Sequence, residues 1–204
     1  MNFVTSSDFT LVPYSIPNIN KVVNTFEDYA NEQIEKMLEE KLLGFTLTAA
    51  FKTGLAQVTI EEKWTKLRDG AEYTYGGKTY KWKGMRDLFR PFIYAMWLRD
   101  NYDNFSGIGV TVANAENSQV IDPSQRIVRA WNDFAHKAGV PRRGSFWNYS
   151  DFGYPYLITY YDRFFGYNGC ANSENTLYGF VEANKVDYPD WQYCDVGLMN
   201  TLGI

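Results

Sequence analysis

Few residues of this sequence have the types and spacing that catalysis requires. The single histidine, His136, lies near the end of an apolar-periodic segment, where it is better placed to complement a helix dipole than to act as a general base. The carboxylate pairs Glu61/Glu62 and Asp100/Asp103 could in principle form the acid and base of a glycosidase. Their spacing, however, is typical of solvated helix surfaces. We therefore expect no catalytic residues.

Motifs for metals, nucleotides and acyl transfer are also missing. Cys170 and Cys194 lack the spacing of metal ligands, and we expect free buried thiols in a reducing compartment rather than a disulfide. The sequence contains no phosphate-binding loop, no dinucleotide-binding glycine motif, and no HExxH, CxxC or GxSxG pattern. We predict that the protein is not an enzyme and binds no cofactor or metal.

The composition of the chain argues against further classes of function. The 204 residues fit one domain, or one domain with an appendage, and carry a net charge of −4, which argues against a dedicated nucleic-acid binder. No signal peptide is evident, and no segment reaches the roughly 18 apolar residues of a membrane span. Aromatic residues make up 18% of the chain. They could fill a core and an interface, which we favour, or form a stacking surface for sugar.

The predicted fold is mainly α, a helical bundle of about five to seven helices with a small β-hairpin and an extended arm. Residues 1–24 read as an extended N-terminal arm, frayed or docked on a neighbour. Residues 25–140 form the helical core, which contains the hairpin 72–82 and the arm 105–121. Residues 141–204 form an aromatic-rich C-terminal helical region.

Caps and glycine stops divide the first part of the core into three helices. The starts are Thr25 with Asp28 and a Thr59/Glu62 capping box, and the stops are Gly44, Gly54 and Gly70. The second helix should bury Leu47, Ala50 and Phe51. A central helix then spans residues 83–102 with Pro91 inside it, which should bend it.

Two β segments flank the central helix. Tyrosines alternate with polar residues on both sides of Gly76-Gly77, the signature of a two-residue hairpin that covers the core. The arm 105–121 also alternates, and a lone strand must pair with this hairpin or with another subunit. Gly107 and Gly109 would also let the arm fold back on its own domain. The candidate intersubunit residues are Ile108, Val110, Val112, Asn117, Tyr75 and Tyr80.

The remaining segments are predicted from caps and breaks. Asp122-Pro123 opens a helix that ends at Gly139. Residues 140–172 show no clean period, with a partly helical segment around 156–165. Ser173 caps another helix, and a last short helix runs over 190–200. The predicted core comprises Trp64, Leu67, Phe89, Phe92, Ile93, Met96, Trp97, Ile127, Trp131 and Phe134.

The order of several short motifs resembles the head–tail connector (adaptor, neck or ring) proteins of tailed bacteriophages, most closely those of crAss-like phages. The matching marks, over about two-thirds of the chain, are residues 64–70, the hairpin ending at 82–84, the aromatic helix 88–102, 109–110 with 116–118, 131–132, 188–191 and 200–204. The aromatic run 145–169 departs from the pattern.

This resemblance implies a structural protein of the virion neck. It implies a helical bundle with a β extension, assembled in the host cytoplasm as a ring of about twelve copies. Its partners would be the portal protein and the next neck or tail protein. Double-stranded DNA would pass through the lumen without sequence-specific binding, which suits an acidic protein because phosphates should slide rather than stick.

Two other functions stay open from the sequence. A carbohydrate-binding or carbohydrate-active module would use the surplus of tyrosine and tryptophan, and would show exposed coplanar rings in a groove on a monomer. A connector would bury its rings in its core or between subunits. A capsid or tail accessory protein of the same particle would resemble a connector in sequence.

Overall fold

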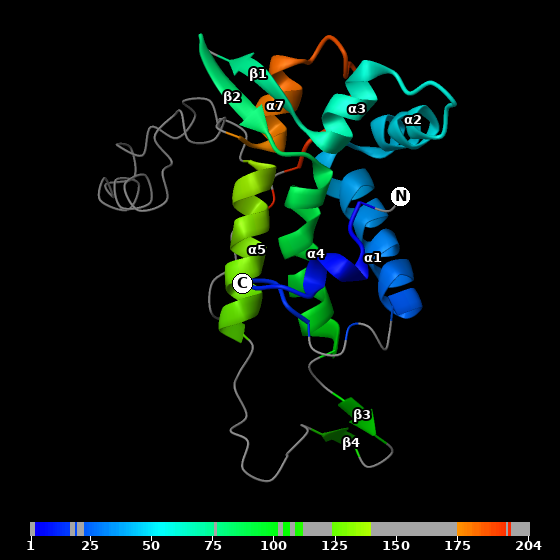
Figure 1. Cartoon of the computed structure of the whole chain (residues 1–204), viewed down its shortest axis with the longest axis vertical. Helices are drawn as coiled ribbons and strands as arrows, with labels where there is room; N and C mark the ends of the chain where they lie inside the picture. Colours follow the sequence, from blue (N-terminus) through cyan, green and yellow to red (C-terminus); the bar gives the residue numbers. More distant parts are fainter. Residues whose placement is uncertain are drawn as a thin grey trace, which may run out of the picture.

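The computed structural model of the chain describes residues 3–16, 19, 23–75, 77–101, 104–106, 109–111, 124–139, 175–194 and 196. The described part is mainly helical with small antiparallel hairpins, as predicted. Its long helices form one tier and most of its shorter elements form a second tier at one end (Figure 1).

Three long helices make the first tier: α1 (Val23–Met37), α4 (Met85–Asn101) and α5 (Ser124–Ala138). Figure 1 shows α4 between the other two. On one side the ring of Phe26 lies 5.0 Å from that of Trp97, and on the other Phe92 lies 4.8 Å from Phe134. The apolar face of α4 is therefore covered on both sides, and Pro91 is buried within it.

The second tier contains the shorter elements: η3, one turn of π-helix (Leu38–Leu42), α2 (Phe45–Leu55), α3 (Glu62–Asp69), β1 (Ala71–Tyr75), β2 (Lys78–Trp82) and α7 (Leu177–Ala183). In the hairpin β1 pairs with β2, with Tyr73 opposite Tyr80. The rings of Tyr73 and Trp82 pack on Phe180 of α7. The hairpin therefore covers the core, as predicted.

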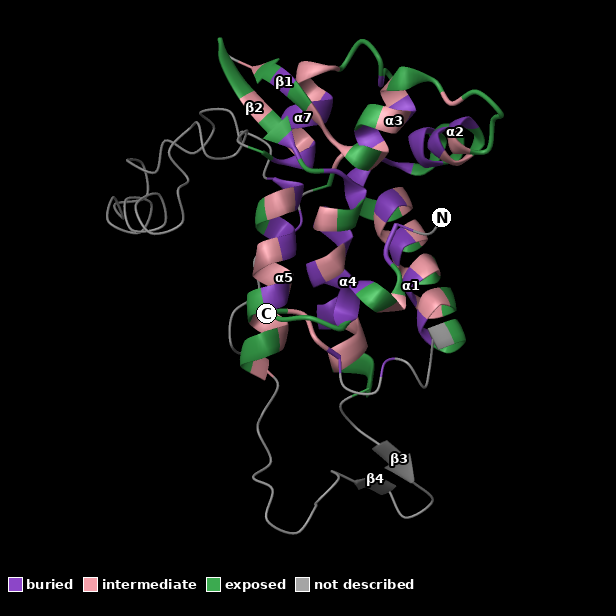
Figure 2. Cartoon of the chain, in the orientation of Figure 1, coloured by how far each residue is buried: buried purple, intermediate pink, exposed green. Residues whose placement is uncertain are grey.

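The predicted core residues all belong to one apolar cluster (Figure 2). Trp64, Leu67, Phe89, Phe92, Ile93 and Phe134 are buried. Met96, Trp97, Ile127 and Trp131 are half-buried and pack against the cluster.

The N-terminal segment is part of this core, not an arm. It contains the short 3₁₀ helix η1 (Ser6–Phe9), which contacts α1 and α4. Its apolar side chains are buried in the same cluster: Phe3, Val4, Phe9, Ile16 and Ile19. Their spacing has no regular period, so the sequence pattern did not reveal their burial.

Several predicted helix boundaries are wrong. Helix α1 begins at Val23, so Thr25 and Asp28 lie inside its first turns. Helix α3 begins at Glu62 with Glu61 at the N-cap, and the Thr59 capping box is not formed. Helix α2 ends at Leu55, one residue beyond the predicted stop at Gly54. The missing side chain of Gly54 leaves room for Trp64, whose ring would lie 2.2 Å from an added Cβ. Ala50, predicted to be buried, is exposed.

The C-terminal part also differs from the prediction. Thr176, rather than Ser173, is the N-cap of α7, and its hydroxyl accepts a hydrogen bond from the Gly179 N–H at 3.0 Å. Residues 190–194 are not helical; they run along η3, where the Cys194 N–H donates to the Lys41 carbonyl. Cys194 is exposed rather than buried.

The arm forms a hairpin of its own. Strand β3 (Asn104–Ser106) pairs with β4 (Gly109–Thr111), with Phe105 opposite Val110. This sheet is separate from β1–β2, so the arm does not pair with the 72–82 hairpin, which was one of the alternatives that the sequence left open. The two hairpins lie at opposite ends of the helix layer (Figure 1). The Asp122-Pro123 cap and the segment 156–165 lie outside the described residues.

Candidate functional site

The carboxylates considered for catalysis are engaged in separate local contacts. Glu61 pairs with Lys63 at 3.1 Å, and Glu62 with Lys66 at 2.9 Å. Asp100 accepts hydrogen bonds from Arg99 and from the Tyr29 hydroxyl. Burial alone would raise the pKa of Asp100, but these two hydrogen bonds outweigh it and hold that pKa below its usual value.

His136 is exposed in the last turn of α5, as its place in the sequence predicted. Asp103 lies outside the described residues. Within the described part of the chain, no group of three or more acidic, histidine or cysteine side chains could hold a metal ion. No helix there is long and apolar enough to cross a membrane.

Aromatic side chains point inward in the described part. Of the rings whose exposure is described, only Phe45 is exposed. A half-buried group, Tyr178, Trp191 and Tyr193, comes nearest to a stacking surface, but its rings are inclined to one another by 51° to 71°. The Trp191 N–H donates to the Leu42 carbonyl, and the Tyr193 hydroxyl to that of Gly139. These rings fasten the C-terminal segment; they do not form a coplanar platform.

The predicted interface residues are not brought together. Tyr75 and Tyr80 are half-buried on the hairpin face that packs on the core. The opposite face, with the exposed side chains of Glu72, Thr74, Thr79 and Lys81, is the one open to a partner. Val110 lies on β4 at the far end of the helix layer. Ile108, Val112 and Asn117 lie outside the described residues. The hairpin and the arm are thus two surfaces rather than one.

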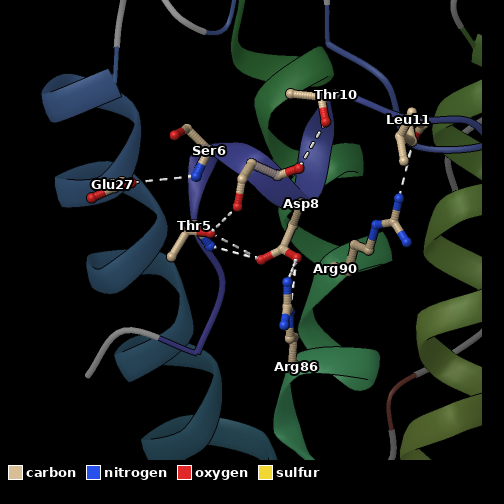
Figure 3. Close-up of polar contacts among 9 residues, drawn as sticks. Thr5, Ser6, Asp8, Thr10, Leu11, Glu27, Arg86 and Arg90 are labelled. Atoms are coloured by element: carbon tan, nitrogen blue, oxygen red, sulfur yellow. Dashed lines mark hydrogen bonds and ion pairs between the residues drawn. The ribbon is translucent and has the colours of Figure 1, made fainter.

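A polar clamp holds the N-terminal segment against α1 and α4 (Figure 3). Asp8 is at its centre: Oδ2 accepts the Thr5 N–H at 2.9 Å, and Oδ1 accepts Nε of Arg86 at 2.7 Å and a second N–H from its Nη2. The Asp8 side chain is 6% exposed, so these donors replace the water it has lost. The Ser6 N–H donates to Glu27 of α1 at 3.3 Å.

The clamp continues with contacts to α4 and α5. Arg90 donates to the Leu11 carbonyl at 3.2 Å, and its guanidinium lies over the ring of Tyr14. The Tyr14 hydroxyl donates to Asp133 of α5, which also pairs with Lys137. Burial, followed by the hydrogen bond to Asp133, raises the pKa of the Tyr14 hydroxyl well above its usual value. The segment therefore ties all three long helices together.

Sequence reasoning overlooked this clamp, although one signal was present. Thr5 and Asp8 have the spacing of a capping box, in which the acidic side chain returns to the N-cap N–H. The partners Arg86, Arg90 and Asp133 could not be found from spacing, because they are far away in the chain. Comparison of the chain with protein-family models, with curated proteins and with solved structures found no match.

Proposed function

We propose that this chain is a structural subunit of a phage neck, a head–tail connector that assembles as a ring of about twelve copies. In this role it docks on the portal protein, links the capsid to the next neck or tail protein, and leaves a channel for DNA. The observation that carries the proposal is the order of the motifs that resemble connector proteins.

Two features of the molecule agree with this role. The resemblance implies a helical bundle with a β extension, and the described residues form a helical layer with a hairpin at each end. Their aromatic side chains lie in the core, where a structural protein needs them, rather than on an open platform. The alternative of a carbohydrate-binding module gains no support from the described part of the chain.

The charge of the chain suits a DNA channel. A net charge of −4 gives the ring a repulsive field toward phosphates, so the duplex can pass without lodging on the protein. Such passage requires no base contacts and no membrane.

The test is the mass and shape of the purified protein, alone and with its portal, by light scattering and negative-stain electron microscopy. We expect a closed ring with a central hole, or an added ring-shaped layer beneath the portal. A protein that stays monomeric in both samples, and adds no density to the portal, would refute the proposal. Sugar binding by a monomer, seen on a glycan array, would favour the carbohydrate module instead.

A further inference from the structure

The two outer edges of the helix layer carry opposite charge. Helices α1 and α5 lie on opposite sides of α4, so each turns one face away from the layer (Figures 1 and 2). Residues 23–42, which form α1 and η3, contain six acidic residues and two lysines. Helix α5 contains two arginines, a lysine and a histidine against one aspartate.

The acidic edge is centred on Asp28 and Glu32. Both side chains are exposed, and their spacing of four residues places them on one face of α1. The buried residues Phe26, Ala30 and Ile34 lie on the opposite face. Neither carboxylate forms an ion pair with a described residue, whereas Glu35 on the same edge pairs with Lys52.

The basic edge is centred on Arg126 and Arg129. Both are exposed on α5. Arg129 lies nearly opposite the buried Phe134, and Arg126 lies around the helix between Arg129 and the buried Ala130. The lysine and the aspartate of this helix neutralise each other, because Lys137 pairs with Asp133 at 3.1 Å. The two arginines form no ion pair with any described residue.

Positions on the two edges can be compared along helix α4, which lies between them. Both neighbours run antiparallel to it: Tyr29 of α1 reaches Asp100, and Lys137 of α5 reaches Asp87. A residue of α1 and a residue of α5 lie at the same height when both are level with the same residue of α4. Counting along the helices from these contacts and from the contact of Phe92 with Phe134 places Asp28 and Arg126 at one height. Glu32 and Arg129 share the next height. The match holds to within about one helical turn, about 5.4 Å.

We propose that the acidic edge of one subunit packs against the basic edge of the next, with Asp28 beside Arg126 and Glu32 beside Arg129. The inference rests on the proposed ring and names its lateral contact. A closed ring relates neighbours by rotation alone, without a rise along the axis. If the ring axis is parallel to these helices, the two edges can pair only where their charges lie at the same height. Asp28 and Arg126 meet this condition, as do Glu32 and Arg129.

A second copy of the chain fits these edges better than a nucleic acid. DNA would use the arginines but would leave the acidic edge without a role, and phosphates would be repelled by it. The heterologous contact uses both edges at once, and complementary charges also align the partners during assembly.

Charge reversal on each edge tests the pairing in the full-length chain. One variant carries Asp28→Lys with Glu32→Lys, and the other carries Arg126→Glu with Arg129→Glu. Each alone places like charges face to face, which should weaken self-association on the order of a hundredfold. Mixed in equal amounts, each acidic edge again meets a basic edge, so the mixture should form closed rings of alternating subunits.

The control Asp187→Lys with Asp190→Lys changes the net charge as the first variant does, at exposed positions of the second tier, and should assemble normally. Thermal melting verifies that every variant is folded. The pairing is overturned if either variant assembles like the wild type, or if two folded variants fail to assemble when mixed. It is also overturned if the arginine variant assembles but loses only DNA retention. A wild-type chain that forms no ring would instead refute the proposed function.

Discussion

Asp8 is the only buried carboxylate among the described residues, and its contacts explain why it is tolerated. Arg86 supplies two N–H donors and Thr5 a third, so both carboxylate oxygens have partners. A buried charge that loses its partner costs more than an exposed pair ever contributes, because it cannot recover its hydration. The N-terminal segment is therefore held by a bond whose loss should be measurable.

Replacing Arg86 tests this clamp. Arg86→Ala should lower the free energy of unfolding by about 1–3 kcal/mol, because it leaves Asp8 buried with one fewer charged partner. Arg68→Ala is the matched control: its partner Asp69 is half-exposed, and the loss should stay below about 1 kcal/mol. Urea unfolding measures both. Equal losses for the two variants would show that the Asp8 contact has no special role.

Two tyrosines should make the protein sensitive to alkali. Burial and then hydrogen bonds to Asp133 and Asp100 raise the pKa values of Tyr14 and Tyr29 well above the ordinary value. The unfolded chain releases these protons near pH 10, while the folded protein retains them. Their contribution to stability is therefore complete below that pH and decreases as the pH rises above it.

The free energy of unfolding, measured in urea from about pH 9 to pH 11, should thus fall with pH. Tyr14→Phe with Tyr29→Phe should make this fall shallower, since phenylalanine has no proton to release. An unchanged slope in the double variant would mean that other groups cause the alkaline loss.

At the scale of elements, the hairpin β1–β2 depends on a close crossing at its base. Gly70 ends α3 and Gly84 precedes α4, with φ of +99° and +89°. A Cβ on Gly84 would lie 2.7 Å from the Arg68 carbonyl oxygen. The backbone around Gly70, before the hairpin, is in contact with the backbone around Gly84, after it, and a side chain at either glycine would prevent this contact.

Gly84→Ala should therefore cost about 3 kcal/mol or more, from the positive φ and from the backbone clash. Gly77→Ala, at the hairpin turn, has a φ of +78° but no atom within 4 Å of the added Cβ. It should cost only the conformational part, about 1–2 kcal/mol. Melting curves separate the two, and similar losses would contradict the close crossing.

At the scale of the whole molecule, the β3–β4 hairpin has the least support from the other described elements. Two strands of three residues are marginal in water without cover. The alternation of Ile108, Val110 and Val112 gives the arm an apolar face that a neighbouring subunit or the portal could cover.

Val110→Asp should leave the monomer folded, with an unchanged melting temperature, and prevent ring assembly or attachment to the portal. Thr111→Asp is the matched control, since neighbouring residues of a strand point to opposite faces, and it should assemble normally. Native mass spectrometry measures the oligomeric state of both variants. An unfolded Val110→Asp monomer, or normal assembly, would count against an intersubunit role for the arm.

The sequence by itself determined the elements whose signals are local. Apolar residues at helical spacing located α1, α4 and α5, and alternating tyrosines around Gly76-Gly77 located the first hairpin. These elements can be predicted because a helix or a tight hairpin forms its hydrogen bonds within a few residues. The spacing of apolar residues in the sequence therefore has the same period as the structure.

Only the tertiary structure decided the features that join distant parts of the chain. Thr59 and Ser173 were plausible caps, but packing placed the helix starts elsewhere, and Gly54, one residue before the end of α2, leaves room for Trp64. The N-terminal clamp and the matched charges of Asp28 and Arg126 depend on how three helices lie side by side. Contacts such as that of Arg86 with Asp8, which are 78 residues apart, leave no period in the sequence, because their spacing is set by the packing of the core and not by the backbone between them.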